Sequence, residues 1–264
     1  MTQRPPRYLP ESPWGWAAAG TLAGLLVAGL VFAPAQWLAK AVDQVSSGRV
    51  LLTDARGTIW NGSAQFTLAG GTGSRDFASL PTRLEWQLSP RWGHGVASFY
   101  TACCTQQPLR IQLAPRWGGM EVTVTNGQST WPASLLAGLG TPWNTLQPGG
   151  LLVLSSQGLS ITFIQGQYVL AGQAKLEALD LSSRLSTLRP LGSYRLTLQG
   201  GAVPGIELDT LNGSLQLAGS GRWVGSRLHF EGVASATPER VEALSNLLNI
   251  IGRRDGAQSI ISMG

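Results

Sequence analysis

The feature that most constrains this chain is a stretch of twenty-eight uncharged residues that runs from Ser12 to Ala39. Its centre, Trp14 to Ala33, reads WGWAAAGTLAGLLVAGLVFA. Twenty such residues form a helix of about 30 Å, which matches the hydrocarbon thickness of a bilayer. The sequence therefore predicts one transmembrane anchor in residues 14–38, preceded by a short N-terminal segment, residues 1–13.

Charges on either side of this stretch predict its orientation. Arg4 and Arg7 precede it with one acid, Glu11, whereas Lys40 behind it is balanced by Asp43. Basic residues are enriched on the cytoplasmic side of membrane helices. We therefore expect a single-pass protein of the inner membrane, with a cytoplasmic N-terminus and the bulk of the chain in the periplasm. The residues expected to hold the anchor in the lipid and at its interfaces are Trp14, Trp16, Leu25, Leu26, Val31, Phe32 and Trp37.

A cleaved secretory signal is the alternative for the same stretch. Ala33-Pro34-Ala35 has the small-x-small pattern of a processing site. The apolar region of a signal peptide is usually about 7 to 15 residues long, and the run here is longer. The length of the run therefore favours a retained anchor. In both interpretations the rest of the chain is exported across the membrane.

Composition indicates strands rather than helices after the anchor. Only 12% of the residues are charged, 34 are glycine, and the only lysines are Lys40 and Lys175. Such a chain has few of the charged residues that solvent-exposed helices usually contain. The net charge is +5, and the arginines are spread along the sequence. Nucleic-acid binding requires a dense basic stripe, so no nucleic-acid partner is expected.

Short apolar runs bounded by Gly, Pro or Asn recur through the exported part, and several alternate apolar with polar residues. This pattern is typical of antiparallel strands with one buried face. We predict an all-β fold, an extended and twisted antiparallel sheet in one or two β-halves, residues 39–130 and 151–264. The clearest runs are Thr82–Leu88, Val96–Ala102, Leu109–Leu113, Met120–Val124, Leu151–Leu154, Leu159–Phe163, Tyr168–Leu179 and Tyr194–Leu198.

Two segments depart from this strand pattern. Residues 131–150 are rich in Pro and Gly, and Pro132–Leu139 is predicted to be a short helix capped by Thr130. Near the C-terminus, Thr237-Pro238 starts an amphipathic helix that Gly252 ends. Arg253 and Arg254 follow it, where cations complement a helix C-terminus.

Residues for catalysis or metal binding are sparse. The adjacent Cys103 and Cys104 are expected to be buried or free thiols, because a bond between strand neighbours needs a strained turn. His94 and His229 lack the spacing of a metal motif. We expect no metal, no cofactor, no small-molecule substrate and no enzymatic activity. A saccharide-active enzyme would instead need two carboxylates about 5 to 10 Å apart in a cleft.

Six motifs carry a resemblance to a known family. The motifs, in chain order, are PAQWLA at Pro34–Ala39, GTIWNGSA at Gly57–Ala64, WPASLLAGLGTPWNTLQPGG at Trp131–Gly150, LGSYRL at Leu191–Leu196, TLNGSLQLAGSGRW at Thr210–Trp223 and LLNIIGRR at Leu247–Arg254. With these motifs the chain resembles the type II secretion system protein N family, also called the general secretion pathway N protein, over almost its full length.

The resemblance implies a bitopic inner-membrane component of the machine that exports folded proteins through an outer-membrane secretin. It implies an accessory role in assembly, or in linking the inner-membrane platform to the secretin, with these components as partners and no catalytic residues. An unpaired edge strand is one candidate contact, since it can accept a strand from another protein. The side chains considered for partner contact are Trp131, Trp143, Asn144, Arg253 and Arg254, of which the first three also fit a purely structural role at the connector.

A different class of function stays open beside this one. A long twisted sheet with an apolar concave face is also suited to carry lipid acyl chains or other amphipathic ligands across the periplasm. An apolar cavity left open at one end favours that alternative, whereas a filled core favours the secretion scaffold.

Overall fold

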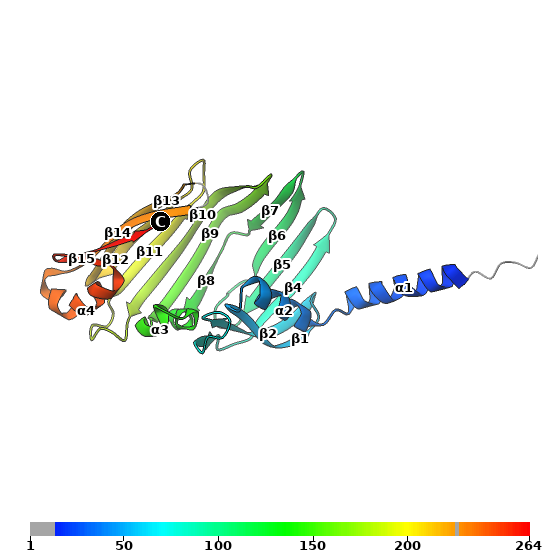
Figure 1. Cartoon of the computed structure of the whole chain (residues 1–264), viewed down its shortest axis with the longest axis horizontal. Coiled ribbons are helices and arrows are strands. Elements are labelled where there is room, and N and C mark those ends of the chain that lie inside the picture. The colour runs from blue at the N-terminus through cyan, green and yellow to red at the C-terminus, as the bar shows by residue number, and fades with distance from the viewer. Residues whose placement is uncertain (1–13, 225–226) are drawn as a thin grey trace, which may run out of the picture.

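The computed structural model describes residues 14–224 and 227–264. The segment predicted to be cytoplasmic, residues 1–13 with Arg4 and Arg7, lies outside the described residues. The rest forms a long N-terminal helix followed by one broad sheet that short helices flank (Figure 1). The predicted all-β class, with an apolar N-terminal helix, is confirmed.

The helices are few, and only the first is long. Their bounds are α1 Trp14–Val31, α2 Ala35–Val45, the 3-10 helix η1 Ala133–Leu139, α3 Trp143–Leu146, the 3-10 helix η2 Pro238–Arg240 and α4 Val241–Ile251.

The strands occupy most of the chain between α2 and the C-terminus. Those before the connector are β1 Val50–Gly57, β2 Asn61–Ala69, β3 Phe77–Ser79, β4 Leu84–Arg91, β5 His94–Thr101, β6 Leu109–Arg116, β7 Gly119–Val124 and β8 Gly127–Pro132. Those after it are β9 Gly149–Ile164, β10 Gln167–Ser182, β11 Gly192–Gln199, β12 Gly205–Gly213, β13 Leu215–Val224, β14 Arg227–Ala236, β15 Arg253–Asp255 and β16 Gln258–Met263.

All strands join one 16-stranded antiparallel sheet. Its order is β1-β2-β4-β5-β6-β7-β9-β10-β11-β12-β13-β14-β16-β15, with β3 beside β2 and β8 beside β9. Since β7 and β8 both pair with β9, the ranges on either side of the connector belong to the same sheet. Figure 1 shows the sheet fanning out and twisting, with α2, α3 and α4 along its lower edge.

The long hairpin β9–β10 forms the middle of the sheet and carries an irregularity at its centre. The register shifts between Ala171 and Gln173, opposite Gly158. Gly172 has a positive φ of +81°, and a Cβ there would lie 2.1 Å from the Gly158 carbonyl oxygen, so only glycine fits. The strands predicted separately at Leu151–Leu154 and Leu159–Phe163 are therefore one strand, β9, bent at this bulge.

The connector differs from its prediction in two respects. The helix predicted from Pro132 is a 3-10 helix that starts at Ala133, and its predicted cap, Thr130, pairs with β9 as part of β8. The second helix, α3, was not predicted. Pro142 has a helical ψ of -6° and precedes the first residue of α3.

The predicted C-terminal helix is present as α4 and covers one end of the sheet. Leu244 and Leu248 are 0% exposed, and they pack with Leu215 and Ala234 of the sheet in the largest buried cluster. Ser259 of β16 donates a 2.7 Å hydrogen bond to the Leu248 carbonyl and so satisfies a group at the helix end. The predicted cap at Thr237 makes no side-chain bond, since the 3-10 helix η2 intervenes.

This packing predicts unequal effects of two substitutions on α4. Leu248→Ala leaves a cavity under the helix and is expected to lower the free energy of unfolding by about 2–5 kcal/mol. Ile250→Ala, two residues away and 47% exposed, is the matched control and should cost far less. Denaturant unfolding of the detergent-solubilised protein, followed by circular dichroism, measures both. Equal losses would show that α4 does not pack on the sheet.

Candidate functional site

The strand register places apolar side chains on one face of the sheet across almost its whole width. Directly paired residues of antiparallel strands lie on the same face of a sheet. The register therefore shows, strand by strand, which side chains share a face. Leu88 pairs with Ala97, Val122 with Ile161 and Leu196 with Leu208. We call this side the apolar face; its large side chains include Leu88, Phe99, Ile111, Leu113, Val122, Ile161, Leu170, Leu196, Leu208 and Phe230.

The opposite side of the sheet, the polar face, carries the hydrophilic residues of the same strands. Gln112 pairs there with Thr123. Arg195 and Glu177 form an ion pair of 2.8 Å. Glu207 and Asp209 also lie on this face, where they pair with Thr197 and Arg195. The sheet is therefore strongly amphipathic.

Three small cores cover parts of the apolar face, and all involve the flanking helices. Ala35 of α2 packs with Ala64 and Trp86. Leu135 of η1 packs with Leu80 and Cys104. The third is the cluster under α4. These elements lie near the ends of the strands along one edge of the sheet (Figure 1).

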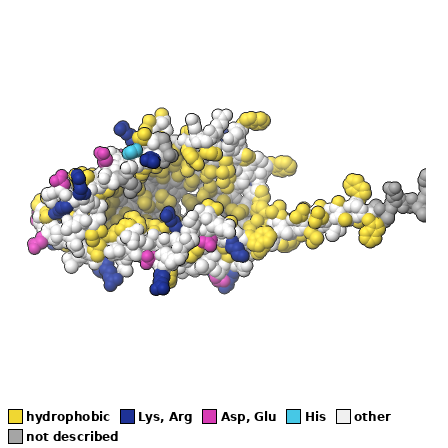
Figure 2. Space-filling model, in the orientation of Figure 1, with side chains coloured by type: hydrophobic (Ala, Val, Ile, Leu, Met, Phe, Trp, Pro, Cys, Tyr) yellow, Lys and Arg dark blue, Asp and Glu magenta, His cyan; other side chains and the backbone are white. Residues whose placement is uncertain are grey.

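The remainder of the apolar face is covered by nothing in residues 14–224 or 227–264. Met120 is 46% exposed, Ile161 41% and Phe163 39%, although all three lie on the paired strands β7 and β9 in the interior of the strand order. Figure 2 shows hydrophobic side chains gathered in a hollow of the molecule, with most Lys and Arg on its outside. An apolar surface of this extent marks an interaction site in a folded protein.

The pKa is shifted at two described side chains, and neither lies on the uncovered part of the apolar face. The side-chain hydrogen bond from Arg83, with help from Arg56, lowers the pKa of Asp54 at the surface of β1. Burial raises the pKa of Tyr194 well above its usual range, and its hydroxyl donates to the Leu215 carbonyl at 3.0 Å. In the described residues no three His, Cys, Asp or Glu side chains gather as metal ligands would.

The N-terminal helix is fixed to the sheet at its C-terminal end. The Trp60 indole donates to the Leu30 carbonyl at 2.8 Å, and the Ile59 amide donates to the Ala33 carbonyl at 2.9 Å. α1 is the one described helix that is long and apolar enough to cross a membrane, as a span or a signal. Of the predicted anchor residues, six lie on α1 or the turn after it, whereas Trp37 lies on α2, beyond the break at Pro34.

The structure separates the residues considered for partner contact into two groups. Trp143, 38% exposed, lies beside Asn144 at the start of α3, and the Asn144 amide donates to Asp76 at 2.9 Å. Trp131 is nearby in sequence but partly buried, where it packs on the core of η1 and donates to Ser129. Trp131 therefore has a structural role.

Arg253 and Arg254 directly follow α4 and lie at the edge of the sheet far from β1. Both belong to β15, which pairs with β16. Gly252 is extended, with φ -162°, and turns the chain directly from the helix into this strand. Arg253 is exposed on the polar face, whereas the Arg254 Nη1 is buried on the apolar side.

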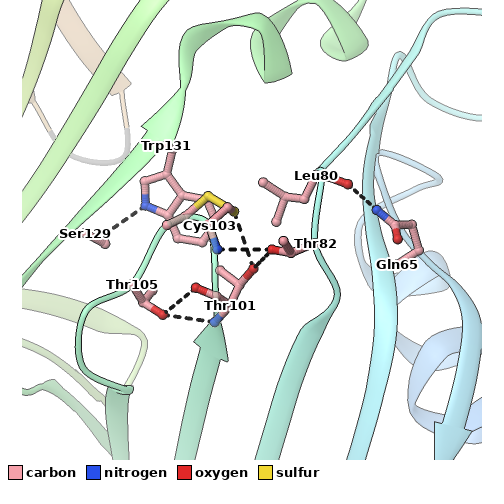
Figure 3. Close-up of a disulfide and its surroundings, with 9 residues drawn as sticks. Gln65, Leu80, Thr82, Thr101, Cys103, Thr105, Ser129 and Trp131 are labelled. Atoms are coloured by element: carbon pink, nitrogen blue, oxygen red, sulfur yellow. Dashed lines mark hydrogen bonds between the residues drawn. A yellow bond between two sulfur atoms is a disulfide. The ribbon is translucent and has the colours of Figure 1, made fainter.

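The two cysteines are bonded to each other, so the expectation of free or buried thiols is wrong. They form the turn that follows β5 (Figure 3). The Cys103 amide donates to the Thr82 hydroxyl at 3.2 Å, and the Thr101 amide donates to Thr105 at 2.9 Å. The spacing rule failed because the residues occupy a turn rather than a strand, which allows neighbouring side chains to meet.

A family model for type II secretion system (T2SS), protein N, matches residues 48–260, most of the chain. The chain belongs to this family. The match covers β1 to the first half of β16 and thus nearly all of the apolar face, and family membership makes the chain a type II secretion component. No curated protein and no solved structure matches this family member.

The apolar face predicts binding of a hydrophobic probe by this T2SS protein N family member. Ile161→Glu places a charge on the exposed part of this face and is expected to reduce the fluorescence of bound anilinonaphthalene sulfonate several-fold. Thr162→Glu, the next residue of β9, faces the opposite side and should leave it unchanged. A fluorescence titration in nanodiscs measures both, and equal reductions would contradict the one-sided assignment.

Proposed function

We propose that this chain is a non-enzymatic accessory component of the type II secretion system, held in the inner membrane by α1 with the sheet in the periplasm. There it assists assembly, or links the inner-membrane platform to the outer-membrane secretin. Family membership supports the assignment to the type II secretion system. The excess of basic residues before the apolar stretch, Arg4 and Arg7, supports a cytoplasmic N-terminus.

The observation that carries the proposal is the attachment of a membrane-length helix to one end of a continuous sheet. The hydrogen bonds from Trp60 and Ile59 to the end of α1 hold the two together without a long linker. Because one sheet runs from β1 to β15, a contact at its far side is mechanically connected to the membrane through backbone hydrogen bonds. This geometry suits a component that bridges two others.

Two exposed regions at different positions of the sheet are suited to partners. Trp143 and Asn144 form one, near β3 and η1, and Arg253 on β15 forms the other. β15 is only three residues long, and it ends the sheet, so an added strand from another protein can pair there. We assign these regions to secretin or platform subunits.

Photocrosslinking in native membranes tests this assignment. A photoreactive residue at Trp143 or at Arg253 is expected to yield adducts with secretin or platform subunits, identified by mass spectrometry. The matched control is Trp131, which is partly buried against η1 and should yield adducts within this chain. Absence of any secretion component from both exposed positions would overturn the proposal.

A second candidate function follows from the uncovered apolar face. An apolar surface left open on one side, with Ile161 and Phe163 about two-fifths exposed, is what a carrier of lipid or other amphipathic ligands requires. Acyl chains bound to this face would bury apolar area, and each Å² removed from water contributes about 25 cal/mol of favourable free energy. This function is compatible with membership of a secretion complex.

Lipid retention during purification tests this second function. We expect the protein to retain phospholipid beyond the annulus around α1, and Ile161→Glu to lower the amount measured by native mass spectrometry. Thr162→Glu, on the polar face, is the matched control that should retain as much lipid as the unmodified protein. Equal lipid content in all three proteins would contradict a carrier role while leaving the secretion role intact.

A further inference from the structure

Two hairpins of the sheet end in the same four residues, Pro-Arg-Trp-Gly, at Pro90–Gly93 and Pro115–Gly118. In both, the tryptophan and glycine form a two-residue turn, since Arg91 pairs with His94 and Arg116 with Gly119. The glycines have the same φ of +78°, which explains why this residue occupies that turn position. The repeat gives two copies of one turn.

The two tryptophans at these turns are fully exposed. Trp92 is 102% exposed and Trp117 101%, although tryptophan normally buries most of its large surface in a fold. Neither side chain contributes to a buried cluster. The two tryptophans therefore do not contribute to packing within the described part of the chain.

The register brings the two turns side by side at one end of the sheet. β4, β5, β6 and β7 are consecutive neighbours, so the hairpins lie about 10 Å apart. Gly95 pairs with Leu113, which places both turns at the same end of the strands, with the second about two residues, or ~7 Å, further out. Both turns therefore project from the same end of the sheet.

The N-terminal helix is attached at this same end. Its end is hydrogen-bonded to the turn between β1 and β2, and Asn61 after that turn pairs with Gln87 of β4. From Gln87, β4 runs five residues further to Trp92, about 16 Å beyond the attachment. Figure 1 shows the end of the β4–β5 hairpin pointing to the side on which α1 leaves the sheet.

The chemistry of the turns matches a membrane interface. Tryptophan is enriched at the level of lipid headgroups, and arginine beside it attracts anionic lipids. Arg116 is paired with Glu121, whereas no carboxylate lies within ion-pair distance of Arg91 in the described part of the chain. Behind the turns, Met120 and Tyr168 are exposed and extend the apolar face to this end.

We propose that the hairpin ends carrying Trp92 and Trp117 enter the headgroup region of the bilayer that α1 spans, through contact with anionic phospholipid. The sheet then has two attachments to one membrane, which fix its orientation, and the open end of the apolar face meets the lipid surface. This inference rests on α1 being a retained membrane span.

Site-specific fluorescence in nanodiscs of anionic phospholipid tests the proposal with the full chain. Cys103 and Cys104 are bonded to each other, so one introduced cysteine is the only free thiol under non-reducing conditions. An environment-sensitive label at Trp92→Cys or Trp117→Cys, each with the other tryptophan retained, is expected to show a blue shift and quenching by spin-labelled lipid.

Two further labelled positions serve as controls. Phe77→Cys replaces another exposed aromatic residue, 72% exposed, at the opposite ends of the strands, and should report water and no quenching. Leu26→Cys on α1 should be quenched if the helix spans the bilayer. Quenching at Leu26 with labels at 92 and 117 as unquenched as at 77 would overturn the proposal. Absence of quenching at Leu26 would instead refute the anchor on which it rests.

Discussion

The alternation of apolar and polar residues along the strands constrains everything else in this molecule. It recurs in most strands, so one side of a very broad sheet is apolar, and within residues 14–224 and 227–264 the flanking helices and loops cover only parts of it. These elements contact the ends of the strands along one edge. Apolar area left in water is unfavourable by about 25 cal/mol per Å², so the open remainder of the face favours any apolar partner.

The sequence carried the alternation, most of the strand runs and the two helices that the structure shows at the ends. Lys175-Leu176-Glu177 and Leu228-His229-Phe230 read as strands with one apolar side, and they are. What alternation cannot indicate is whether a second layer packs on the apolar side. The absence of such a layer in the described residues, which defines the candidate site, required the strand order and the burial of each residue.

The errors have local physical causes. The bulge at Gly158 and Gly172 joins two predicted strands, because glycine was interpreted as a break rather than as a bend. The Cys103–Cys104 bond was missed because the residues were placed in a strand. The repeated turn with Trp92 and Trp117 is present in the sequence as two copies of the tetrapeptide Pro-Arg-Trp-Gly.

The N-terminal helix, the open apolar face and the exposed turns all fit the membrane attachment that we propose. α1 joins the sheet at the β1–β2 turn, while β15 lies at the far edge of the sheet. If α1 spans the bilayer as proposed, the β1–β2 end of the sheet lies next to the membrane, and the apolar face and the β15 edge are left for other molecules. The polar face, with its paired Arg195 and Glu177, stays in contact with water.

The central claim is that the apolar face is covered by another molecule and not by this chain. A photoreactive side chain at Ile161, irradiated in native membranes, tests it most directly, because mass spectrometry identifies what the residue touches. The account predicts adducts with lipid or with another protein. Adducts formed mainly with other segments of the same chain would contradict it.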